Sequence, residues 1–250
     1  MSVRDPQFDW MDPHSSPRRP VVRFDAIREA WHWLQAEWFT WAVAMIVVLL
    51  GNSLTTKVID SFFHLGNGGG MGGFRWPMPR EEMAVQVILG ALINGFFVGG
   101  LFRMACRQVR GERIGVNDLF SVINVLGELA LGSVLCAAAV AITSFFCFVI
   151  PGLIVHGLLM FTLPLIVDGG LPATTAMRSS WHALKGQWLT AAVFHVVTSF
   201  LSSLGVVFCC VGLLVTGPLY VLSVTVLYRD FFLTKGVSFQ EKPAPPYSDF

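Results

Sequence analysis

Two histidines are the first residues of this sequence that could do chemistry, because each lies in a nearly uncharged apolar stretch. An ionisable group at membrane depth is costly, which makes His156 and His195 candidates for a polar relay that moves protons. Counted along ideal helices, the two lie about 14 Å apart in depth, too far for one metal ion whose ligand nitrogens sit about 2 Å away. We therefore expect each to hydrogen-bond between helices, and the relay is the weaker interpretation.

Glu128 is the third candidate for a polar relay. It lies two residues before an apolar stretch, and in the repeat described below it aligns with Ala36 and Gly186. This position predicts a carboxylate at the membrane surface, solvated by water, more strongly than a group inside the bilayer.

The five cysteines show no C-x-x-C spacing and no histidine pattern of a zinc site. Cys147, Cys209 and Cys210 fall near the ends of apolar stretches that we expect to face outward, where an oxidising compartment would permit a disulfide. Three buried thiols are the favoured interpretation. Whether Cys147 pairs with Cys209 or with Cys210 is left open.

Other signatures of catalysis are missing from the sequence. There is no nucleophile with a base at an interpretable spacing, no carboxylate pair at one depth and no cluster of metal ligands, so we predict no catalytic, cofactor or metal site. The glycine-rich stretch 66–73 (GNGGGMGG) lacks the strand and helix that flank a phosphate-binding loop, and a linker is the favoured interpretation.

Two further patterns suggest contacts with lipid or with other helices. If the second span continues as a helix, one face of it at the cytoplasmic surface carries four arginines: Arg103, Arg107, Arg110 and Arg113. Attraction to anionic phospholipid there is worth about 1 kcal/mol per residue. A role as topology determinants explains them equally well. Gly95-x-x-x-Gly99 predicts close helix packing, either within the chain or in self-association between chains.

The composition of the chain indicates that it is embedded in a membrane. Hydrophobic residues make up 54% of the chain, charged residues 13%, and the mean hydropathy is +0.63, so a bilayer is implied. We predict an all-α polytopic membrane protein with about six transmembrane helices: 38–57, 83–106, two in 130–168 separated at Pro151-Gly152, and two in 188–228 separated between Gly205 and Gly212. Residues 1–23 and the tail 235–250 are expected to be disordered, flanking a single membrane domain over 24–234.

Charge predicts how the chain is threaded. With six crossings, 14 of the 17 Lys and Arg residues fall on the side that holds both termini. The positive-inside rule places that side in the cytoplasm. A net charge of +1 gives no reason to expect nucleic acid as a partner.

An internal repeat organises the spans into three hairpins. Residues 28–43 and 178–193 are identical at eight positions at an offset of 150, and 120–135 join them more weakly. Each unit reads as an interfacial amphipathic helix leading into a hairpin, with tryptophans as interfacial anchors: Trp31, Trp38, Trp181 and Trp188. Trp and Leu three residues apart are expected to share the membrane-facing side. The repeats are parallel, unlike the inverted repeats of many transporters.

Several short motifs carry a resemblance to a known group of proteins. They are RGERIGVNDLF at 110–120, IPGL at 150–153, PLIVD at 164–168 and KG at 185–186. The chain resembles, over roughly 25–232, a family of poorly characterised polytopic proteins of the bacterial inner membrane, akin to the membrane domain fused to some glycerophosphodiester phosphodiesterases. The resemblance implies a multi-pass location in the bacterial cytoplasmic membrane. It supplies no catalytic residues, and no soluble stretch is long enough to hold the phosphodiesterase domain.

Three functions are compatible with this sequence. The preferred one is a non-catalytic scaffold or accessory component that organises lipid or partner proteins, for which few inward-facing polar groups are expected. The alternative is a small-solute or lipid transporter, which predicts a polar cavity at mid-membrane. The third is a membrane-embedded lipid-modifying enzyme, which predicts that an acid, a base and a nucleophile converge.

Overall fold

The computed structural model describes residues 20–66, 80–147, 149–207 and 212–233, and within these ranges the chain is all-α with no strand. The helices are α1 (Asp25–Ala36), α2 (Trp38–Gly66), α3 (Arg80–Val109), α4 (Leu126–Cys147), α5 (Val149–Leu158), α6 (Thr162–Val167), α7 (Ala173–Leu184), α8 (Trp188–Val207) and α9 (Leu213–Tyr228). Two 3₁₀ segments, η2 (Val116–Val125) and η3 (Lys185–Gln187), precede α4 and α8, and a π-helical turn, η4 (Arg229–Leu233), follows α9.

Among the described residues, four stretches are long and apolar enough to cross a membrane: Trp38–Val58, Val116–Ser144, Ile150–Val167 and Ala173–Gly205. This confirms the all-helical membrane class. The predicted second and sixth spans form α3 and α9, which are not among the four, and α9 has only 16 residues.

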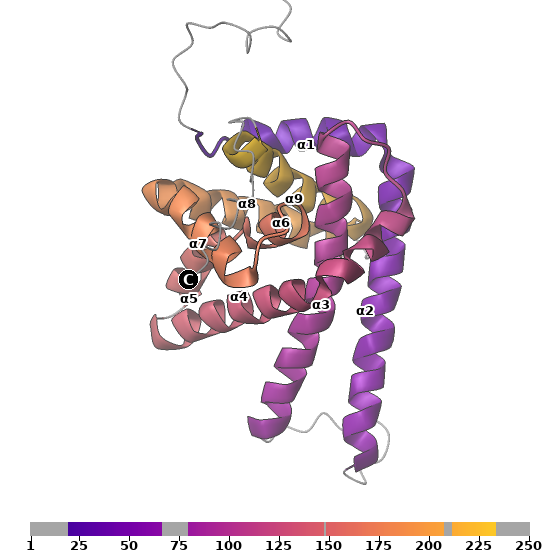
Figure 1. Cartoon of the computed structure of the whole chain (residues 1–250). Helices are drawn as coiled ribbons and strands as arrows, with labels where there is room; N and C mark the ends of the chain where they lie inside the picture. The colour runs from indigo at the N-terminus through magenta and orange to yellow at the C-terminus, as the bar shows by residue number, and fades with distance from the viewer. Residues whose placement is uncertain (1–19, 67–79, 148, 208–211, 234–250) are drawn as a thin grey trace, which may run out of the picture.

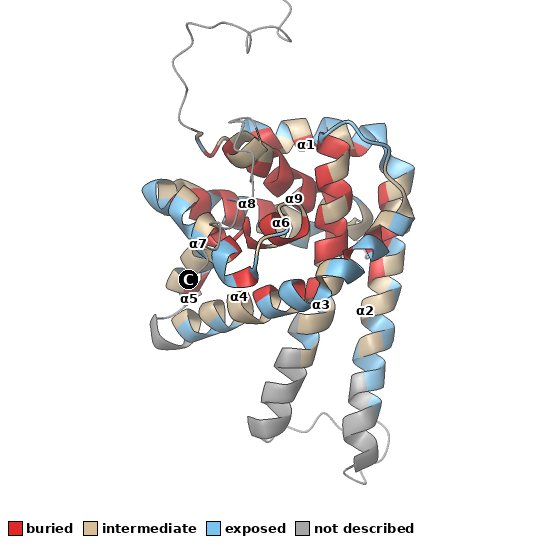
Figure 2. Ribbon diagram, in the orientation of Figure 1, coloured by how far each residue is buried: buried red, intermediate tan, exposed pale blue. Residues whose placement is uncertain are grey.

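The helices form a long pair and a group packed beside it (Figure 1). α2 and α3 run side by side as a long pair, α1 lies across one end of them, and the other helices gather on one side of α3. α4 crosses α3 instead of running parallel to it. Buried residues concentrate in α9, α6 and the half of α3 nearest α1, whereas most of α2 is only partly covered (Figure 2).

The repeat is visible in the burial pattern. Ala26, Ala30 and Leu34 are buried in α1, and the positions 150 residues later, Ala176, Ser180 and Leu184, are buried in α7. A spacing of four places each set on one helical face. The tryptophans are exposed, with Trp31 at 41% and Trp181 at 43%. The expectation that Trp and Leu share a membrane-facing side is therefore wrong, because leucine belongs to the inner face.

The third repeat unit departs from the helix expected for it. Its first part is η2, a 3₁₀ segment with Leu119 and Val122 buried, and Asp118 accepts a hydrogen bond from the Gly115 amide at its start (2.9 Å). It packs against α3 at Gly100, where an added Cβ would collide with the backbone carbonyl of Leu119. The weaker sequence match of this unit thus corresponds to a different local structure.

The structure shows where the residues of two predicted turns and of one glycine motif lie. Pro151-Gly152 was expected to separate two spans, but both residues lie inside α5, which ends at Leu158. Gly205 and Gly212 pack backbone to backbone, since a Cβ on Gly205 would lie 2.7 Å from the carbonyl carbon of Gly212. Gly95 and Gly99 face Ser133 and Leu129 of α4, so packing within one chain accounts for this motif.

Candidate functional site: a cavity between five helices

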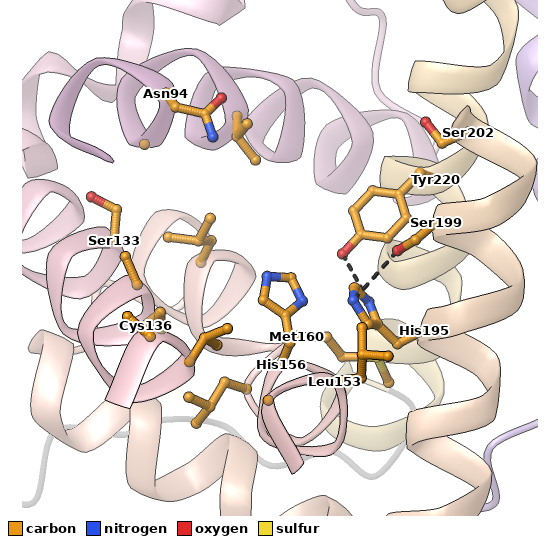
Figure 3. Close-up of a pocket in the computed structure, with 18 of the residues that line it drawn as sticks. Asn94, Ser133, Cys136, Leu153, His156, Met160, His195, Ser199, Ser202 and Tyr220 are labelled. Carbon is orange, nitrogen blue, oxygen red and sulfur yellow. Dashed lines mark hydrogen bonds between the residues drawn. The ribbon is translucent and has the colours of Figure 1, made fainter. Parts of the chain in front are cut away.

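A cavity of about 780 Å³ lies among α3, α4, α5, α8 and α9 (Figure 3). This volume is within the range of roughly 300–1,000 Å³ that small-molecule sites occupy. Each of the five helices contributes at least one polar side chain to the lining: Asn94 from α3, Ser133 from α4, His156 from α5, His195 and Ser199 from α8, and Tyr220 from α9.

The two histidines meet in this cavity. The centres of the His156 and His195 rings lie 4.2 Å apart, with their planes inclined by 39°. The predicted separation in depth is therefore wrong. It placed the turn between two spans at Pro151, whereas Pro151 lies inside α5, and α5 packs against α8, which carries His195.

His195 is the centre of a short polar chain. It is 5% exposed, and its Nε2 lies 3.4 Å from the Ser199 hydroxyl while its Nδ1 lies 3.5 Å from the Tyr220 hydroxyl. Both distances are long for hydrogen bonds, so these groups retain capacity for another partner. His156 is more open and lies beside His195 along the cavity wall.

The two histidine rings lie closer together than two ligands of one zinc ion would. Two imidazoles that bind one tetrahedral zinc through bonds of about 2 Å have ring centres about 5 Å apart. The observed 4.2 Å is shorter. Among the described residues, no group of three or more His, Cys, Asp or Glu side chains is close enough to hold a metal ion.

Asn94 occupies the wall opposite the histidines (Figure 3). Its side chain is exposed to the cavity, and its amide has no hydrogen-bond partner within the described part of the chain. A free amide can both donate and accept a hydrogen bond. The cavity thus presents hydrogen-bonding groups on two sides.

The described lining contains no Asp, Glu, Lys or Arg. Its titratable groups are His156, His195, Tyr220 and Cys136, and the remaining surface is formed mainly by Leu, Val, Ala, Phe, Met and Gly. The cavity is therefore apolar with a hydrogen-bonding zone and no fixed charge.

Glu128, the third relay candidate, lies outside this lining. It is exposed, and its carboxylate accepts a hydrogen bond from the backbone amide of Ala173, the first residue of α7 (2.8 Å). An acidic side chain is favourable at a helix N-terminus, where amide groups lack helical partners. Its visible role is to cap α7.

Three of the four arginines proposed to contact lipid bond within the chain. Arg103 donates to the carbonyl of Val167 (2.5 Å), Arg110 pairs with Asp168 (2.5 Å), and Arg107 pairs with Glu112 (2.8 Å) and also with Asp118. Arg113 is exposed. These bonds tie the end of α3 to η2 and to the end of α6, and contact with phospholipid stays a prediction.

An ionic cluster that the sequence did not reveal joins the two ends of the described chain. Glu29 of α1 pairs with Arg229 of η4 (2.6 Å) and with Arg23 (2.8 Å), and Arg23 also pairs with Asp230 (2.7 Å). Burial alone would raise the pKa of Glu29, but hydrogen bonds and charge attraction from Arg229 and then Arg23 outweigh it, so this pKa lies below its ordinary value.

The cysteine question falls outside the described side chains. No side-chain position is described for Cys147, Cys209 or Cys210, so their pairing stays a prediction. Cys136 lines the cavity, and Cys106 is buried in the core.

Neither a protein-family model, nor a curated protein, nor a solved structure matches the chain. The resemblance to bacterial inner-membrane proteins therefore rests on the short motifs alone, and functional inference depends on the cavity.

Proposed function

We propose that this protein is a carrier that binds a small lipid-like molecule or solute in the cavity between α3, α4, α5, α8 and α9. The observation that supports this is a cavity of about 780 Å³ to which all five helices contribute polar side chains. A concave, mostly apolar site with a few convergent polar groups is the usual form of a small-molecule site.

The cavity favours a carrier over a scaffold. A scaffold was expected to have few inward-facing polar groups, whereas His195, Asn94 and Tyr220 face a common space from three different helices. Polar groups at membrane depth are costly, so their convergence on one cavity calls for a ligand that uses them.

The polar chain at His195 supports binding more than catalysis. Ser199 and His195 lie one turn apart on α8, an order that superficially resembles a nucleophile and its base. A base of this kind is normally oriented by a carboxylate, and the described lining offers Tyr220 in that place and no Asp or Glu. The lipid-modifying enzyme is therefore the weaker alternative.

We further propose that the carrier crosses a bacterial inner membrane six times, with both termini in the cytoplasm. The 30 residues of α3 correspond to about 45 Å of helix, longer than the roughly 30 Å hydrocarbon core. The arrangement of 14 of the 17 basic residues on one side supports the orientation.

The test fills the cavity. Ala137 lines it, whereas the next residue, Ala138, is exposed and lies outside the lining, so Ala137→Trp and Ala138→Trp form a matched pair. After extraction in mild detergent, native mass spectrometry of the wild-type protein should detect a stoichiometric small molecule. The ligand occupancy of Ala137→Trp should be at least about tenfold lower than that of the wild type, and Ala138→Trp should retain the wild-type occupancy. Equal occupancy in both variants, or none in the wild type, would contradict the carrier.

A further inference from the structure

We infer that the cavity selects an amphiphile whose polar group is uncharged, such as a long-chain alcohol or another lipid with a hydroxyl head. This inference rests on the proposed carrier function and names the chemical class of its ligand. It follows from the charge, the hydrogen-bonding groups and the walls of the cavity.

The first argument is charge. The described lining has no Lys or Arg to pair with a phosphate or sulfate, and no Asp or Glu to pair with an ammonium group. The nearby arginines do not supply the missing cation, because Arg103 donates to the Val167 carbonyl and Arg110 pairs with Asp168, and neither lines the cavity. Burying an unpaired charge costs far more than burying a hydroxyl that finds hydrogen bonds.

The second argument is the set of hydrogen-bonding groups. Ser199 and Tyr220 each carry a hydroxyl that both donates and accepts, and both approach the His195 ring at long distance, 3.4 and 3.5 Å. A ligand hydroxyl also donates and accepts, so it can complete this set without leaving a buried group unpaired. The ring of His156, 4.2 Å from that of His195, widens the same polar zone.

The third argument is the rest of the wall. Leu153, Leu159 and Leu163 continue the lining from α5 into α6, and Val140 faces the same cavity from α4. A hydrocarbon chain along this surface would bury apolar area at roughly 25 cal/mol per Å². The ligand therefore needs both an apolar chain and a small polar head.

The test uses three probes that share one saturated chain: the long-chain alcohol, its phosphate monoester and its trimethylammonium analogue. Each is added to the full-length protein in nanodiscs, and bound probe is counted by native mass spectrometry. The alcohol should bind at least about tenfold more tightly than either charged probe. Tighter or equal binding of a charged probe would overturn the inference yet leave the carrier intact. Failure of all three to bind, together with equal ligand occupancy in Ala137→Trp and Ala138→Trp, would overturn the carrier itself.

Three variants locate the head group. Tyr220→Phe removes one cavity hydroxyl and should weaken alcohol binding about three- to tenfold. Tyr228→Phe removes a hydroxyl that donates to Asp168 outside the lining, and binding should not change. Asn94→Lys adds a cation at an exposed cavity position and should allow the phosphate probe to bind. Equal effects of Tyr220→Phe and Tyr228→Phe would refute the assigned head-group position. If a variant does not fold, the comparison of the three probes on the wild type decides.

Discussion

The rings of His156 and His195 lie 4.2 Å apart, although one belongs to α5 and the other to α8. The contact arises because α5 packs against α8. Pro151 and Gly152, which were expected to form the turn between two spans, lie inside α5. The packing of these two helices thus brings both rings into one polar zone of the cavity.

The ionic cluster around Glu29 predicts a stability effect that depends on pH. Because Arg229 and Arg23 hold the pKa of Glu29 below its ordinary value of 4.5, its stabilising effect is present above that pH and is lost as pH falls through the lowered pKa. Glu29→Gln should lower the unfolding free energy by only about 1 kcal/mol at neutral pH, because the network is partly exposed. The effect should be smaller in acid, where Glu29 of the wild type is protonated.

The matched control is Glu37→Gln. Glu37 is exposed, and its carboxylate accepts a hydrogen bond from the hydroxyl of Thr40. Its loss should change stability by less than about 0.5 kcal/mol. Thermal unfolding in detergent at several pH values measures both variants, and a Glu29→Gln protein that matches wild type at every pH would rule out a stabilising cluster.

Close packing between α3 and η2 predicts opposite outcomes for two glycines of one helix. A Cβ at Gly100 would collide with the backbone of Leu119, whereas a Cβ at Gly90 meets no atom of the described side chains and backbone within 4 Å. Gly100→Ala should destabilise the protein by about 1–3 kcal/mol because backbone cannot move aside cheaply. Gly90→Ala should be neutral or stabilise by up to about 1 kcal/mol, since alanine favours the helix. Chemical or thermal unfolding of both variants decides, and similar stabilities would show that this contact is loose.

The sequence predicted those features that depend on local spacing. Trp31 and Trp181 occupy equivalent exposed positions because the same residues at the same spacing build the same helix face twice. The pairing of Glu29 with Arg229, by contrast, could not be predicted from local spacing. These residues are 200 positions apart, and no local pattern in either segment indicates that α1 packs along α9.

The hydrogen-bonding zone of the cavity could be predicted only in part. His156 and His195 were recognised as candidates from their apolar surroundings, but Ser199, Tyr220 and Asn94 were missed because single polar residues are common in membrane helices. A helical spacing of four between His195 and Ser199 was the available signal. Their convergence depends on how α5 and α9 pack against α8, which the spacing within any one segment does not indicate.

The proposed threading predicts where fused reporters are found. A reporter after Phe250 should be cytoplasmic, and one inserted in the glycine-rich stretch 66–73 between α2 and α3 should be external. The reason is the concentration of Lys and Arg on the side of the termini. Paired alkaline phosphatase and green fluorescent protein fusions measure this, and reversed signals would exclude the six-span orientation.

The exposed tryptophans of α1 and α7 predict that both helices lie at the membrane surface. Trp31 and Trp181 are exposed by 41% and 43%, while another face of each helix is buried against the core. Aromatic rings of this kind favour the headgroup boundary. Trp31→Ala combined with Trp181→Ala should lower thermal stability in detergent by about 1–2 kcal/mol and leave the number of crossings unchanged, because the spans themselves supply insertion.

Lipids brominated at different depths provide a direct measurement, since bromine quenches nearby tryptophan fluorescence. Replacing both residues should remove mainly the quenching by shallow bromines. The control variant changes Trp41, which is fully buried and donates to Gln108 (2.8 Å), and its replacement by Phe should leave shallow quenching in place. If an aqueous quencher reached Trp31 and Trp181 freely and the double variant kept wild-type stability, these helices would face water and not the membrane surface.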